Sequence, residues 1–171
     1  MSQLKVNSII PVGGIPSSGG NVYGGGIIQI VQNETETEAA ITTTSFADIG
    51  LSATITPTSS SSKILVLYDV QVRIFIATTD NSAAIQIVRG STAIKTPSQN
   101  YQLGYNARSV YNGTSGTSYL VSRAVLDSPN TTSSITYKIQ GKMRNTGSGN
   151  SVEFQDDGEY YSFITLMEVS A

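Results

Sequence analysis

Carboxylates are the side chains in this sequence that could do chemistry. Asp156, Asp157 and Glu159 fall in one short stretch, and further acids are spread along the chain: Asp48, Asp69, Asp80 and Asp127. Glycosidases use two carboxylates that flank the scissile bond, so a polysaccharide depolymerase is one hypothesis. Acids clustered in a turn are more often a solvated loop, and the 156–159 stretch lacks the spacing of a calcium-binding EF-hand loop. We therefore favour a chain that is not an enzyme and has no metal site.

Other catalytic and cofactor motifs are missing from the sequence. The chain has no histidine and no cysteine. This excludes the usual nucleophile–base pairs and zinc sites. Three glycines at 24–26 precede a predicted strand instead of a helix, so they do not form a dinucleotide-binding motif. We expect no cofactor and assign no catalytic residue.

Tyrosines give the clearest indication of binding. Tyr101, Tyr105 and Tyr111 lie in a stretch that is also rich in Asn, Gln, Gly and Ser, and Tyr119 follows it. Tyrosine among small polar residues is typical of adaptable recognition surfaces. Exposed rings of this kind would suit a sugar ligand, although the same rings could also belong to a core or a subunit interface.

Composition limits the partners. Of the 171 residues, 39% are hydrophobic and only 13% are charged, with a net charge of −2. A charge this small does not favour nucleic acid. No secretory signal and no apolar run of about 20 residues is visible, so we expect synthesis in a cytoplasm and no membrane insertion. The length suits one domain with a core of its own.

Residues 1–26 are predicted to be an extended anchoring arm. They carry a short apolar segment and a glycine-rich leash, with too little apolar content to fold alone. The residues expected to dock on a partner are Val6, Ile9, Ile10, Val12 and Tyr23.

Residues 27–171 read as strands separated by Ser, Thr, Asn and Gly turns. The longest candidate, 63–77, alternates apolar and wetter positions with the period of two of a half-buried strand. Residues 40–49 and 51–56 are predicted to pair around a turn at 48–50. In all, eight to ten strands at intervals of about 8–12 residues favour an antiparallel β-sandwich of the jelly-roll type.

The last predicted strand, 161–169, is apolar on both faces. Phe163 and Met167 point one way, while Ile164 and Leu166 point the other. A strand with two apolar faces needs both covered, and a neighbouring subunit would cover the second. We therefore name these four residues as candidates for a subunit interface.

Several stretches resemble structural proteins of marine phages. They are LKVNSII at 4–10, GGIIQIVQ at 25–32, SFADIGLS at 45–52, TPTSSSSKILV at 56–66, LDSPNTTSSITYKIQ at 126–140 and ITLME at 164–168. Their order and spacing resemble the cyanophage-type virion structural or tail-fibre-like family. The strand pattern is also similar to the trimeric jelly rolls of tumour necrosis factor and complement type.

The resemblance implies a virion surface protein, assembled in the host cytoplasm as a homotrimer. Its arm would dock on capsid or tail proteins. The chain has no heptads and no shaft, which favours a capsid decoration, head fibre or short tail knob over a long fibre. The alternative is a receptor-binding module that holds a host surface glycan through Tyr101, Tyr105 and Tyr111.

Overall fold

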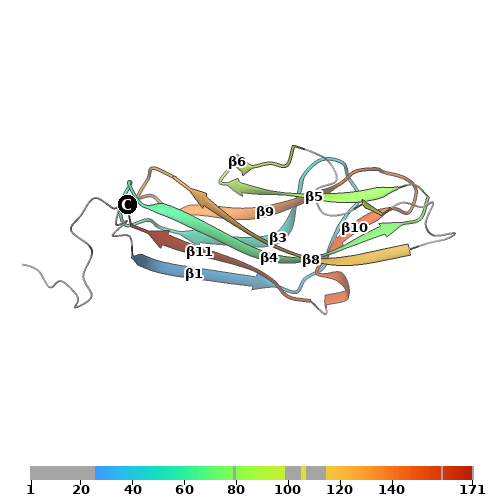
Figure 1. Cartoon of the computed structure of the whole chain (residues 1–171), viewed down its shortest axis with the longest axis horizontal. Helices are drawn as coiled ribbons and strands as arrows, with labels where there is room; N and C mark the ends of the chain where they lie inside the picture. Colours follow the sequence, from blue (N-terminus) through green and yellow to red (C-terminus); the bar gives the residue numbers. More distant parts are fainter. Residues whose placement is uncertain (1–25, 79, 99–104, 107–114, 159, 171) are drawn as a thin grey trace, which may run out of the picture.

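The computed structural model describes residues 26–78, 80–98, 105–106, 115–158 and 160–170, with the backbone alone at 105, 106, 115 and 157. Apart from Gly26, the predicted arm lies outside the described residues. Figure 1 shows the described elements as two layers of strands along one long axis. They are β1 (Ile27–Thr35), β2 (Ala39–Ile41), β3 (Ala47–Ile55), β4 (Lys63–Ile76), β5 (Asn81–Arg89), β6 (Thr92–Lys95), β7 (Tyr105–Asn106), β8 (Ser115–Asp127), β9 (Ile135–Met143), β10 (Ser151–Phe154), the 3₁₀ turn η2 (Asp156–Gly158) and β11 (Ser162–Val169).

The strands form two antiparallel sheets. In sheet A, β1 pairs with β11 and β11 with β4, while β8 runs along the whole of β4. Because β8 takes one edge of β4, β11 and β10 share the other, and β2 continues the sheet beyond β10. Sheet B has the order β3-β9-β5-β6, with β7 also beside β5.

The wrapping is that of a jelly roll. Sheet A carries β1, β11, β4 and β8, and sheet B carries β3, β9, β5 and β6. Strands from the two ends of the chain therefore lie side by side, as β1 and β11 do in Figure 1. This confirms the predicted antiparallel sandwich of jelly-roll type.

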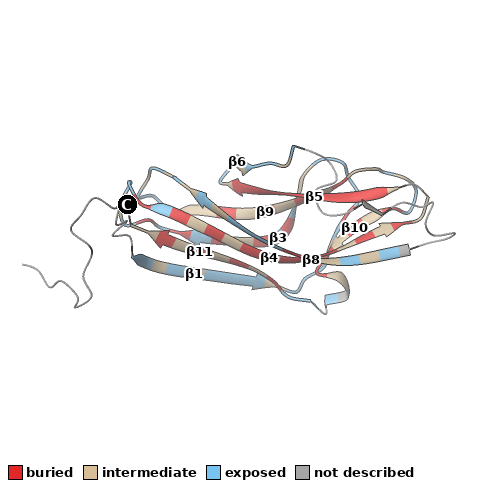
Figure 2. Cartoon of the chain, in the orientation of Figure 1, coloured by how far each residue is buried: buried red, intermediate tan, exposed pale blue. Residues whose placement is uncertain are grey.

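The core fills the space between the sheets. Along β4, side chains alternate between buried and half-buried, which Figure 2 shows as alternating red and tan. The inward side chains of β4 meet Ile49 and Leu51 of β3, Tyr137 and Ile139 of β9 and the ring of Phe154, all at or near zero exposure. Each large apolar side chain buried in this way stabilises the fold by about 1.5–3 kcal/mol. The period of two predicted for residues 63–77 is confirmed.

One local prediction is wrong. The expected turn at 48–50 does not separate two strands, because β3 runs straight through it and pairs with β9 on both sides. The register shifts between Asp48 and Ser52, and Gly50 has a φ of 78°. Glycine here makes a β-bulge, which kinks the strand and leaves it unbroken.

Candidate functional site

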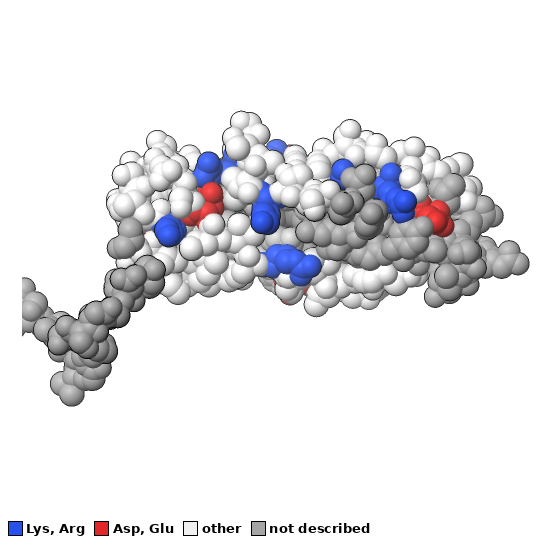
Figure 3. Space-filling view, turned by 45° about the horizontal axis from the view of Figure 1, so that its top comes forward, with Lys and Arg blue, Asp and Glu red and all other residues white. Residues whose placement is uncertain are grey.

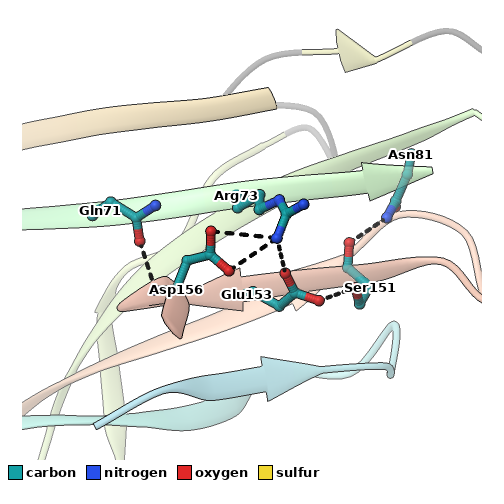
Figure 4. A network of polar contacts seen from close by, with 6 residues as sticks. All are labelled: Gln71, Arg73, Asn81, Ser151, Glu153 and Asp156. Carbon is teal, nitrogen blue, oxygen red and sulfur yellow. Dashed lines mark hydrogen bonds and ion pairs between the residues drawn. The ribbon is translucent and has the colours of Figure 1, made fainter. Parts of the chain in front are cut away.

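The acidic stretch predicted as a possible catalytic site is tied to the neighbouring strands. Nη1 of Arg73 on β4 lies 3.1 Å from Oδ1 of Asp156 and 3.4 Å from Oε2 of Glu153. The backbone N–H of Asp156 donates to Oε1 of Gln71 at 3.0 Å, and Ser151 donates to Glu153 at 2.7 Å. Figure 4 shows these groups turned toward one another along β4 and β10. The one guanidinium of Arg73 therefore pairs with both carboxylates, as in a structural ion-pair cluster.

The other predicted acids lie in different parts of the sandwich. Asp127, at the end of β8, accepts hydrogen bonds from Arg89 and from the hydroxyl of Tyr137, both at 2.7 Å. Burial and this hydrogen bond raise the pKa of Tyr137, so its hydroxyl stays protonated. Asp69 lies on β4. Asp80 directly precedes β5, and its backbone carbonyl accepts from the side-chain amide of Asn145, which follows β9.

No metal centre is visible in these acids. Over the described ranges, no group of three or more His, Cys, Asp or Glu side chains is placed to hold a metal ion. The side chains of Asp157 and Glu159 lie outside the described residues, so the depolymerase alternative stays a hypothesis.

Most of the predicted binding residues also lie outside the described part of the chain. These are Tyr101 and Tyr111 and the arm residues Val6, Ile9, Ile10, Val12 and Tyr23. Tyr105 is described only as backbone, in the short strand β7. The glycan and docking assignments therefore stay predictions.

The four interface candidates on β11 separate by face. Ile164 and Leu166 have 0% exposure and pack in the core between the sheets, so they are not available to a partner. Phe163 and Met167 are half-buried and point away from the core. Only these two can contribute to a second face.

That outer face of sheet A carries a continuous apolar row. Ile30 lies opposite Met167, Met167 opposite Leu65, and Leu65 opposite Leu126, so the row crosses four strands. Ile30 and Leu126 are 57% and 54% exposed. We call Ile30, Met167, Leu65 and Leu126 the apolar row.

A shallow hollow of about 490 Å³ lies beside the apolar row. Its lining includes Leu67, Phe163, Ala124 and Asp69. Ser122 donates to Oδ2 of Asp69 at 3.0 Å. Oδ1 of Asp69 is buried and accepts no hydrogen bond from the residues that the structure describes. The hollow thus combines apolar side chains with a carboxylate that Ser122 holds in place.

The outer face of sheet B is different in character. Asp48 accepts from Gln140 at 2.6 Å and from Lys138 at 2.9 Å, and Thr54 bonds to Thr136 across β3 and β9 at 2.7 Å. Although burial opposes ionisation, the bonds from Gln140 and Lys138 lower the pKa of Asp48. In the view of Figure 3, basic groups are scattered over largely uncharged surface, and the acidic groups that can be seen lie beside basic ones.

Of the four residues in the apolar row, Met167 of β11 alone was identified from the sequence. Ile30, Leu65 and Leu126 come from three other strands, and their alignment depends on register between segments far apart in the sequence. The alternation of each strand was the available signal, but it does not say which residues become neighbours.

No protein-family model matches the chain, and a search of curated proteins finds no match. Within the described ranges, no helix is long and apolar enough to cross a lipid bilayer.

Proposed function

We propose that the chain is a non-enzymatic structural protein on the surface of a phage particle: a capsid decoration, head fibre or short tail knob. Its body would trimerise through the outer face of sheet A, and its N-terminal arm would dock on capsid or tail proteins. The observation that carries the proposal is the apolar row, which includes the more than half-exposed side chains of Ile30 and Leu126. The phage assignment and the number three rest on the sequence resemblance described above.

The two outer faces support assembly through sheet A. An antiparallel sheet with one face on the core normally presents polar side chains to water on the other. Sheet B does so with the Asp48, Lys138 and Gln140 network. Sheet A instead exposes the apolar row beside an apolar hollow. Contiguous apolar surface of this kind marks interaction sites in soluble proteins.

The place where the arm joins the body suits this arrangement. The carbonyl of Gly26 accepts from the backbone N–H of Ser170 at 3.2 Å, so the arm enters at the end of β11. Ile30 of the apolar row follows four residues later. Subunits that meet through this row would bring several arms to one end of the assembly. Several weakly docking arms on one body then bind together much more tightly than one alone.

The test is the mass of the purified protein in solution, measured by light scattering after size exclusion. The wild type is expected at three times the 18.1 kDa of one chain, and the double variant Ile30→Lys, Leu126→Lys at one. Thr54→Lys, on the outer face of sheet B, is the matched control and should stay trimeric. Both variants should melt cooperatively, since all three positions are exposed. A monomeric wild type would contradict assembly through this face, and a stable dimer or tetramer would contradict the trimer.

A further inference from the structure

A second cavity opens between the two sheets, at the edge where β8 faces β6. Its volume is about 150 Å³, and its floor is made by Tyr68, Ile85 and Ile87. This is well above the ~10–15 Å³ that one water molecule needs, so a compact molecule fits. The site does not use the apolar row, although Tyr68, Arg123 and Ala124 also line the hollow beside that row.

Two basic side chains from opposite sheets line this cavity. Arg123 belongs to β8 of sheet A and Lys95 to β6 of sheet B. Both side chains are exposed, and within the described residues neither pairs with a carboxylate. Among the described residues, Arg123 donates to the backbone carbonyl of Ser122, at 2.9 Å. Like charges at one mouth repel, and an anion bound between them would relieve the repulsion.

The hydroxyl of Tyr68 adds an independent observation. Tyr68 is only 8% exposed, and its hydroxyl forms no hydrogen bond within the described part of the chain. Burial raises the pKa of Tyr68, while the nearby charge of Arg123 lowers it in part, so the group is a protonated donor at neutral pH. The hydroxyl oxygen itself remains accessible at the cavity wall, so a ligand oxygen in the cavity could accept its hydrogen bond.

We propose that this cavity binds a compact carboxylate, with the ring of the ligand on Ile85 and Ile87 and its carboxylate among Tyr68, Lys95 and Arg123. The two cations attract the charge, and the tyrosine hydroxyl donates one hydrogen bond to a carboxylate oxygen. Two sources share this chemistry: an acidic sugar and an apolar ring acid.

The experiment titrates the ¹⁵N-labelled full chain with D-glucuronate and with benzoate, and with the neutral D-glucose and benzamide as controls. Saturable shifts at the amides of Tyr68 and Arg123 are expected for at least one acid and for neither neutral compound. Binding of glucuronate would assign the site to acidic sugars, and binding of benzoate alone to apolar acids. Saturable shifts with neither acid, or equal shifts with the neutral compounds, would overturn the proposal.

Variants separate the site from general charge. Arg123→Gln and Lys95→Gln should each weaken binding about tenfold, which corresponds to ~1.4 kcal/mol. Lys63→Gln is the control, because it removes the same charge at the start of β4, away from the cavity. It should leave the affinity for the acid unchanged. Tyr68→Phe keeps the ring and should weaken binding several-fold without lowering the melting temperature. Unchanged affinity in all three cavity variants would show that the acid binds elsewhere and would overturn the assignment.

Discussion

Glu168 has 0% exposure and lies beneath the loop that joins β3 to β4. Its Oε1 accepts hydrogen bonds from the backbone N–H and the hydroxyl of Thr58, both at 2.8 Å. Its Oε2 accepts from Gln29 of β1 at 2.6 Å, and Gln29 also donates to the carbonyl of Thr56. This one carboxylate therefore connects β11, β1 and the loop at one end of the sandwich.

The pH dependence of stability follows from these bonds. Burial opposes ionisation of Glu168, but the hydrogen bonds from Gln29 and Thr58 outweigh it and lower the pKa from 4.5 to about 2. A carboxyl whose pKa is lower in the folded state stabilises the fold above its unfolded pKa. This contribution is therefore fully present above about pH 4.5 and is lost as the pH falls toward 2.

We expect Glu168→Gln to lower the free energy of unfolding by about 2 kcal/mol at pH 7, the usual scale for buried hydrogen bonds to a charged group. For a domain of this size, that is a fall of roughly 4–8 °C in melting temperature. The difference from the wild type should close between pH 4.5 and 2, as measured by thermal melts at a series of pH values.

The matched control for this series is Glu34→Gln, because Glu34 is an exposed acid on β1. Its melting temperature should equal that of the wild type at every pH. A Glu168→Gln difference that stays constant down to pH 2 would show that the loss comes from packing and not from the charge.

The role of Glu168 was not predictable from the sequence. An acid near the end of a strand normally marks the position where the strand meets water. The partners that reverse this expectation, Gln29 and Thr58, lie 139 and 110 residues away along the chain. Only the jelly-roll wrapping, which sets β1 beside β11, brings them together.

At the scale of the element, Gly50 holds the bulge in β3. Its φ of 78° lies in the left-handed region, and the nearest atom to an added Cβ is Oγ1 of Thr35 at 4.0 Å. Gly50→Ala thus adds backbone strain without a clash, at a cost of about 1–2 kcal/mol. Chemical denaturation should show a lower midpoint with an unchanged slope.

Gly26→Ala is the control for this substitution, because no atom lies within 4 Å of its added Cβ and its φ is not in the left-handed region. Its midpoint should equal that of the wild type. If Gly50→Ala also left the midpoint unchanged, the prediction would be contradicted. The shift of register between Asp48 and Ser52 would then not require glycine.

Elements were predictable from the sequence where their signal is local. The alternation along β4 appears as predicted. Gly50 was misassigned because an isolated glycine between apolar residues fits a turn as well as a bulge. The choice is made by pairing with β9, more than 80 residues later, which continues on both sides of the glycine.

At the scale of the whole molecule, the sandwich joins strong internal packing to one apolar outer face. The core residues of β4 and its neighbours are buried without help from a partner. Residues 1–25 should therefore not be needed for the body to fold. The body begins at Gly26, whose carbonyl is bonded to Ser170, so a chain that starts at residue 26 keeps this contact.

Deletion of residues 1–25 is expected to separate assembly from attachment. The truncated chain should melt as the full chain does and keep the same number of subunits in solution, because the apolar row is intact. It should be absent from purified virions, since the arm with Val6, Ile9, Ile10 and Val12 is the proposed docking element. Cryo-electron microscopy of virions carrying either form would measure this and would also place the protein.

Copies spread over the capsid lattice would indicate a decoration protein. Copies confined to the tail or to one vertex would indicate a fibre or knob. Virions that carry the truncated chain at full occupancy would instead assign attachment to the body, with the exposed surface of sheet A as the first region to test.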